Sequence, residues 1–162
     1  MKHAPKSIPI LIAFAAANPA IGADLPKEGT YDYTACYSGT SNMMVFSKTH
    51  SAFSYEMTGS IRSNPPGGMF DKMSLRCVGV NHSFDGKAGG TTVCETVDKD
   101  GHKYLSYFGA KDGKVVREDV SGTGKYEGMV RTTKVEVLGP FPTVKPGTFQ
   151  NCNRQTGTYK LK

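Results

Sequence analysis

Apolar and polar residues alternate in short segments along most of this 162-residue chain, and turn residues separate the segments. Within residues 52–62, for example, Phe53, Tyr55 and Met57 are separated by single polar residues. A period of two over such a length predicts a strand that buries one face. No helical period persists for three turns. The pattern therefore predicts eight or nine strands, at residues 30–38, 42–48, 52–62, 72–84, 91–97, 102–110, 114–120, 126–138 and 148–161. The last of these is expected to be interrupted near Thr156-Gly157.

One connection between these segments predicts a strand register. Asp85-Gly86 lies between two predicted strands and is a strong signal for a two-residue hairpin turn. If the chain turns there, residues whose numbers add up to 171 face each other, and Cys77 becomes the direct neighbour of Cys94. Their Cβ atoms would then be about 4.5–5.5 Å apart, close to what a disulfide needs. A turn at Gly89-Gly90 would remove this argument.

The cysteines predict which strands are linked and so indicate an overall architecture. The chain contains four of them, Cys36, Cys77, Cys94 and Cys152, and this even number predicts two disulfides in an oxidising compartment. With Cys77 paired to Cys94, Cys36 is left for Cys152, and that bond joins the first strand to the last. A closed antiparallel barrel is therefore favoured over a two-sheet sandwich, because closure also removes exposed sheet edges.

The N-terminal segment has the composition of an export signal. A short basic start is followed by the apolar residues 8–17 and then by the small residues Ala20, Gly22 and Ala23. This order predicts a signal peptide at residues 1–23, cleaved after Gly22 or Ala23. The apolar run is too short to span a bilayer, and no later segment predicts a span. Residues 24–162 are expected to form a single domain in the periplasm or outside the cell.

Charge and motif content exclude several classes of function. Without Lys2 and Lys6 the chain keeps 18 basic and 14 acidic side chains, a formal charge of +4, and the two signs are mixed along it. No basic block suggests a nucleic-acid partner. The spacing of His50, His82 and His102 matches no metal-ligand pattern, so neither a metal nor a cofactor is expected. The sequence also lacks a nucleophile elbow and a phosphate loop.

Three charged residues inside predicted strands are weak catalytic candidates: Glu56, Arg76 and Glu95. Arg76 and Glu95 face each other in the same hairpin register. If the pair pointed into a barrel, Glu95 could be poised as an acid or base. A solvent-exposed ion pair is the favoured interpretation, and the same holds for Glu56.

Aromatic residues in or beside the strands suggest a ligand site. Phe53, Tyr55, Tyr107 and Tyr126 are the candidates for ligand binding, because tyrosine offers an apolar wall with a polar tip. The alternative is that these rings simply fill the interior, since an eight-stranded barrel is just wide enough to be filled by its own side chains.

The segment Gly122-Thr123-Gly124-Lys125-Tyr126-Glu127-Gly128 resembles one in the allene oxide cyclase-like and dirigent-like barrels, where a Gly-x-Gly-x-Tyr-x-Gly run opens a long strand. The strand order before it and the Gly-Pro loop before the last strand are also similar, and the whole chain resembles small exported bacterial proteins without an assigned activity. The resemblance implies an eight-stranded, calycin-like barrel and carries over no catalytic residue. Locally, the glycines are expected to permit a tight turn, and Tyr126 is expected to pack in the core.

Three functions follow from these observations. The first is a non-enzymatic barrel that binds a small apolar or aromatic molecule. The second is a cyclase- or isomerase-type enzyme that uses Glu56 or Glu95 as acid or base. The third is an envelope or interaction protein that works through the loops at residues 64–69 and 139–147 or self-associates through an apolar face.

Overall fold

The computed structural model describes residues 26–111 and 114–162, so the predicted signal peptide lies outside the described residues. Strands make up most of this part, and the helical content is one short 3₁₀ turn. The elements in chain order are β1 (Glu28–Val45), β2 (His50–Ser63), β3 (Met73–Phe84), β4 (Lys87–Val97), β5 (Lys103–Lys111), β6 (Lys114–Gly122), the 3₁₀ turn η1 (Gly124–Tyr126), β7 (Val130–Arg131), β8 (Lys134–Val137) and β9 (Thr148–Lys160).

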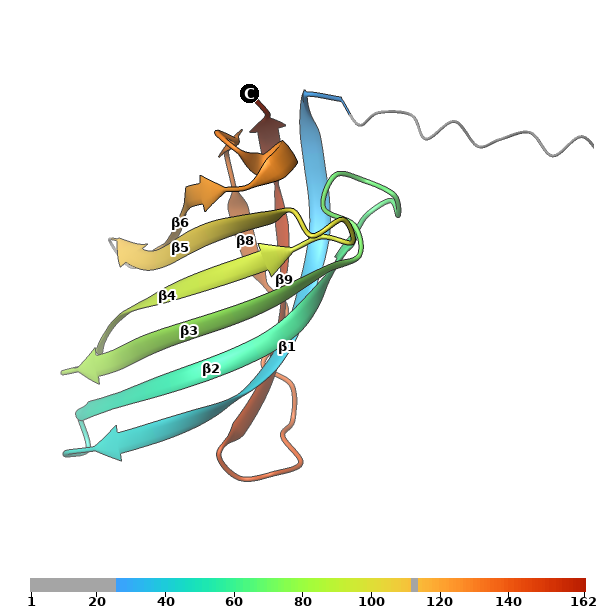
Figure 1. The fold of residues 1–162 in the computed structure, drawn as a ribbon. Coiled ribbons are helices and arrows are strands. Elements are labelled where there is room, and N and C mark those ends of the chain that lie inside the picture. Colours follow the sequence, from blue (N-terminus) through green and yellow to red (C-terminus); the bar gives the residue numbers. More distant parts are fainter. Residues whose placement is uncertain (1–25, 112–113) are drawn as a thin grey trace, which may run out of the picture.

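All strands belong to one antiparallel sheet. Neighbours follow the order β6-β5-β4-β3-β2-β1-β9-β7, and β8 pairs with the same edge of β9 as β7 does. The sheet therefore contains nine strands, and the predicted all-β antiparallel class is confirmed. Figure 1 shows that it curls strongly, so that β6 comes round towards the segment that holds β7 and β8.

The predicted closure of the barrel is wrong, because the sheet is an open half-barrel. Within the described residues no backbone pairing joins β6 to β7 or β8. The edge formed by β7 and β8 is interrupted at Thr132 and Thr133, where the Thr132 amide donates to the Thr158 carbonyl of β9 at 3.1 Å and the Thr158 amide donates to Thr132 Oγ1 at 3.0 Å. An interrupted edge cannot offer β6 a continuous row of hydrogen-bond partners. The opening between these two edges is called the seam below.

Both predicted disulfides are present, Cys36–Cys152 and Cys77–Cys94. Each joins directly opposed residues, on β1 and β9 in one case and on β3 and β4 in the other. Asp85 and Gly86 have φ values of 51° and 76°, as a two-residue hairpin turn requires. The first and last strands therefore do pair, as predicted, and the two bonds fit a protein of an oxidising extracellular environment.

Three predictions about strand boundaries are wrong. Residues 39–41 were expected to separate two strands, yet β1 runs unbroken through them. Gly39 is present there for close approach and not for a turn, because a Cβ at this position would lie 2.1 Å from the Glu56 carbonyl oxygen. The expected long strand at 126–138 is instead split into η1, β7 and β8, while the expected interruption at Thr156-Gly157 is absent from β9.

The buried core fills one end of the concave face. Phe70, in the segment between β2 and β3, is fully buried and contacts five tyrosine rings at centroid distances of 5.1–6.2 Å. Tyr31 on β1 and Tyr104 on β5 both contact it although three strands separate them, so this face of the sheet must be concave. We call this the core end; the β1–β2 and β3–β4 hairpins turn at the opposite, tip end (Figure 1).

Candidate functional site

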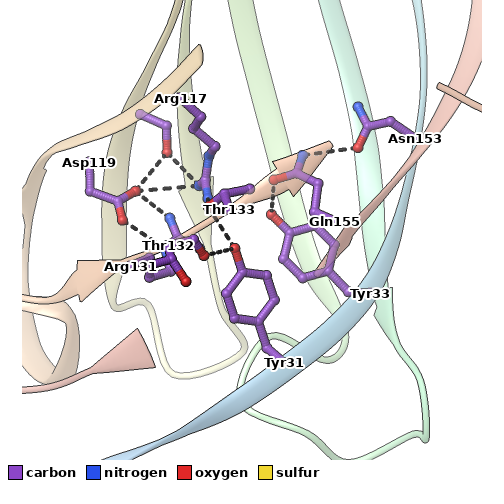
Figure 2. A network of polar contacts seen from close by, with 10 residues as sticks. Tyr31, Tyr33, Arg117, Asp119, Arg131, Thr132, Thr133, Asn153 and Gln155 are labelled. Carbon is purple, nitrogen blue, oxygen red and sulfur yellow. Dashed lines mark hydrogen bonds and ion pairs between the residues drawn. The ribbon is translucent and has the colours of Figure 1, made fainter. Parts of the chain in front are cut away.

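A buried polar network spans the seam at the core end (Figure 2). Arg131 on β7 donates from Nε to Asp119 Oδ2 on β6 at 2.7 Å, and its Nη2 donates to Asp119 Oδ1. Arg117 on β6 lies 3.4 Å from the same carboxylate and donates to Ser106 at 2.7 Å. Side-chain exposure is 0% for Arg131, 3% for Arg117 and 10% for Asp119. The two edges that lack backbone pairing are thus joined by side chains.

The two guanidinium groups also lie against aromatic rings. The Arg131 Cζ atom is 4.3 Å from the Tyr104 ring centroid and 4.7 Å from that of Phe70. Arg117 lies over Tyr104 and Phe108 at 5.7 and 5.4 Å. These cation–π contacts stabilise charges that share a single carboxylate between them. Within the described chain, Arg131 Nη1, Arg117 Nε and the Tyr104 hydroxyl have no hydrogen-bond partner, so donors exceed acceptors here.

The electrostatics keep the network charged. Burial alone would raise the pKa of Asp119, but the hydrogen bond and charge of Arg131, together with the charge of Arg117, outweigh it and lower this pKa. Burial likewise opposes the charged form of Arg131, yet the hydrogen bond to Asp119 raises its pKa. An Asp119 held in the ionised state by two arginines is suited to bridging and not to accepting a proton.

The polar contacts continue across the concave face to β9. The Tyr31 hydroxyl donates to the Thr132 carbonyl at 2.9 Å and contacts Thr133 Oγ1 at 2.6 Å. Tyr33 donates to Gln155 Oε1 at 2.6 Å, and Gln155 in turn donates to Asn153 at 2.9 Å. Figure 2 shows this series of side chains leading away from the seam.

Towards the tip end, the concave face carries aromatic rings that are only half-buried. We call this group the aromatic face. Phe53 and Tyr55 lie 5.8 Å apart on β2, and Tyr55 meets Phe149 of β9 edge-on at 5.9 Å. The Tyr55 hydroxyl hydrogen-bonds Thr92 on β4. The full group consists of Tyr37, Phe53, Tyr55, Phe108 and Phe149, all of intermediate exposure.

Gly79 on β3 makes room for the central ring of this group. A Cβ at position 79 would lie 2.4 Å from Tyr55 Cζ and 2.8 Å from the Thr91 carbonyl oxygen. We expect Gly79→Ala to lower the free energy of unfolding by about 1–3 kcal/mol, because neither the ring nor the backbone can yield freely. Urea unfolding measures this change. Val80→Ala, at a half-exposed position on the opposite face, is the matched control, and an equal effect of both substitutions would contradict the packing argument.

The structure brings two of the four predicted ligand-binding residues together. Phe53 and Tyr55 are neighbours on the aromatic face. Tyr126 lies in η1 with 1% exposure, where it packs in the core as the sequence predicts and its hydroxyl is 3.5 Å from the Met69 carbonyl oxygen. Tyr107 has the opposite strand parity to the interior residues Tyr104 and Ser106, so it belongs to the convex face.

The three weak catalytic candidates also lie on the convex face. Arg76 is opposite Glu95 in the register, as predicted, but its side chain pairs with Glu56 at 2.7 Å. Glu95 instead contacts Lys103 at 3.3 Å. The side chains of Glu56 and Glu95 are 52% and 53% exposed, so both carboxylates are solvated members of surface ion pairs.

A surface hollow of the described chain borders the aromatic face, because Tyr37 is among the residues that line it. Shallow surface hollows of about 260 and 430 Å³ occur beside the Cys36–Cys152 disulfide and beside Lys27, Lys125 and Lys162. Over residues 26–111 and 114–162, no group of three or more His, Cys, Asp or Glu side chains is arranged to hold a metal ion. No helix in the described ranges has the length and apolar character needed to cross a membrane.

The seam residues Arg117, Asp119 and Arg131 are not among the candidates that the sequence pattern indicates. One signal was available, because Asp-Gly at positions 112–113 of the sequence is a hairpin signal that predicts Phe108 opposite Arg117, and the observed register has this pair on one face of the sheet. No protein-family model matches the sequence, and searches of curated proteins and of solved structures gave no match either.

Proposed function

We propose that this protein is an exported, non-enzymatic half-barrel that binds a small apolar or aromatic molecule on its aromatic face. The observation that carries the proposal is the contrast between the two ends of the concave face. At the core end the tyrosines Tyr33, Tyr104 and Tyr126 are at most 2% exposed, whereas the rings at the tip end keep part of their surface exposed. A bound apolar molecule would remove that remaining ring surface from water.

The polar groups among the rings support the same proposal. Asn151 and Asn153 on β9 share the parity of Phe149, and Thr92 on β4 shares that of Cys94, so all three belong to the concave face. A few amide and hydroxyl groups among aromatic walls are typical of sites that orient a small ligand. Because the sheet is open at the seam, a ligand would not need to pass through a closed barrel.

A fluorescence titration tests this proposal. N-phenyl-1-naphthylamine, an apolar aromatic probe, is expected to bind saturably with increased fluorescence. Phe53→Ala is expected to weaken binding by about tenfold, since one buried aromatic contact contributes about 1.4 kcal/mol or more.

The matched control is Tyr107→Ala, which removes a half-buried aromatic ring from the convex face. It is expected to leave probe binding unchanged. No saturable binding, or equal weakening by the two substitutions, would overturn the proposal. The enzymatic alternative gains no support from the convex position of Glu56 and Glu95, so no second function is proposed.

A further inference from the structure

The tip end presents an exposed apolar segment. Four consecutive residues of the β1–β2 hairpin are largely exposed: Met43 at 65%, Met44 at 66%, Val45 at 66% and Phe46 at 86%. Four such residues in a row are costly to leave in water, and an apolar surface of this kind marks a binding surface.

The neighbouring hairpin extends this surface. Phe84 at the end of β3 is 48% exposed and stacks on His50 at 5.7 Å, and the Asp85 amide donates to the Thr49 carbonyl at 3.0 Å. The β1–β2 and β3–β4 turns are therefore in contact. Figure 1 shows that both hairpins project at the same end of the sheet. Both can thus meet one flat surface together.

The charges around the apolar residues are mainly positive. The tip from residue 41 to residue 52 carries Lys48 and no acidic residue, and the β3–β4 turn adds Lys87. The loop before β9 adds Lys145, and Gly147 in that loop accepts a hydrogen bond from Ser41 at 3.0 Å. Asp85 is the acidic residue among them, and it lies 3.7 Å from His50.

We propose that the tip formed by residues 43–46, Phe84, Lys48 and Lys87 docks this protein onto the surface of an anionic lipid bilayer. The apolar side chains enter the boundary between headgroups and acyl chains, while the lysines contact acidic headgroups. Charge complementarity favours this occupant over an uncharged surface. Docking is peripheral and does not depend on a ligand at the aromatic face. It would, however, bring the tip end of that face close to the lipid.

Vesicle flotation tests this docking. The exported form of the protein is mixed with vesicles of phosphatidylglycerol and phosphatidylcholine in equal parts, or of phosphatidylcholine alone. Binding is expected to the anionic vesicles and to fall at high salt, because exposed charges are screened. Phe46→Ser is expected to weaken binding by at least about tenfold. Lys48→Glu and Lys87→Glu should each weaken it by about fivefold or more.

Val80→Ser is the matched control, since Val80 is an exposed apolar residue of the convex face at 53% exposure. It should bind vesicles like the unsubstituted chain, and all variants share one N-terminus, so differences between them report on the tip. Urea unfolding checks that each variant is folded. Phe46→Ser is also expected to leave N-phenyl-1-naphthylamine binding unchanged, which separates this inference from the proposed function.

Three outcomes would overturn the inference. The first is no binding to either kind of vesicle, and the second is equal binding to both. The third is loss of a dimer on Phe46→Ser, seen by light scattering, without any vesicle binding. That result would make the tip a contact between copies of the chain.

Discussion

Replacing both Cys36 and Cys152 with serine is expected to lower the free energy of unfolding by about 4–5 kcal/mol. This bond joins residues 116 positions apart, and in the loop-entropy account a link over such a length strongly restricts the unfolded chain. The measurement is urea unfolding of the oxidised protein and the double variant. A large loss is expected although the bond lies between neighbouring strands that already share a hydrogen-bonded register.

Alanine at both positions is the control for this double variant. Cys36 is exposed and Cys152 is half-buried, so packing and polarity contribute little at these sites. The serine and alanine variants should therefore lose similar stability. A loss below about 2 kcal/mol, or a large difference between the two variants, would show that restriction of the unfolded chain by the disulfide is not the main cause of the stability change.

Asp119→Ala is expected to destabilise the protein by about 3–5 kcal/mol at neutral pH. The substitution leaves the buried guanidinium groups of Arg117 and Arg131 without their carboxylate, and an uncompensated buried charge is costly. Asp32→Ala is the matched control, because Asp32 forms a bidentate pair with Arg154 at the surface. There we expect about 0–1 kcal/mol by urea unfolding. Equal losses would contradict the special role of the seam.

The pH dependence of the stability lost in Asp119→Ala tests whether the charge of the Asp119 carboxylate causes that loss. The folded-state pKa of Asp119 is lowered, so its contribution is fully present above the unfolded pKa of about 3.9. The stabilising contribution of the Asp119 carboxylate is lost as the pH falls through its folded-state pKa. The stability difference between the unsubstituted protein and Asp119→Ala should therefore shrink below about pH 4. A difference that is constant with pH would indicate lost packing and not lost charge.

The hairpin registers could be predicted from sequence because they depend on local chemistry. Asp85-Gly86 can take positive φ at both positions, and that turn fixes every pair between β3 and β4, including Cys77 with Cys94. The pairing of Cys36 with Cys152 then follows. The break predicted at residues 39–41 is wrong, and a glycine such as Gly39, needed for close approach to a neighbouring backbone, looks the same in sequence as a turn glycine.

Closure and the seam could not be predicted in the same way. Whether β6 bonds to the opposite edge depends on how far the whole sheet curls, and no short segment of sequence encodes that. Arg117 and Asp119 alternate along β6 in the manner of a solvated strand face. In the structure this face of β6 is buried, and Arg131 from the opposite edge of the sheet donates to Asp119 across the seam. Strand parity places Phe53 and Tyr55 on one face, whereas it says nothing about Tyr126, which lies in η1.

The position of β1 between β2 and β9 has a consequence for synthesis. Among the strands, β1 is synthesised first and β9 last. The edge of β1 that pairs with β9 therefore has no partner until the chain is nearly complete. Cys77 and Cys94 can oxidise early within their own hairpin, whereas the thiol of Cys36 must wait for the arrival of Cys152. During that interval a wrong cross-link is a hazard, and early formation of the local disulfide protects against it by removing the competing thiols.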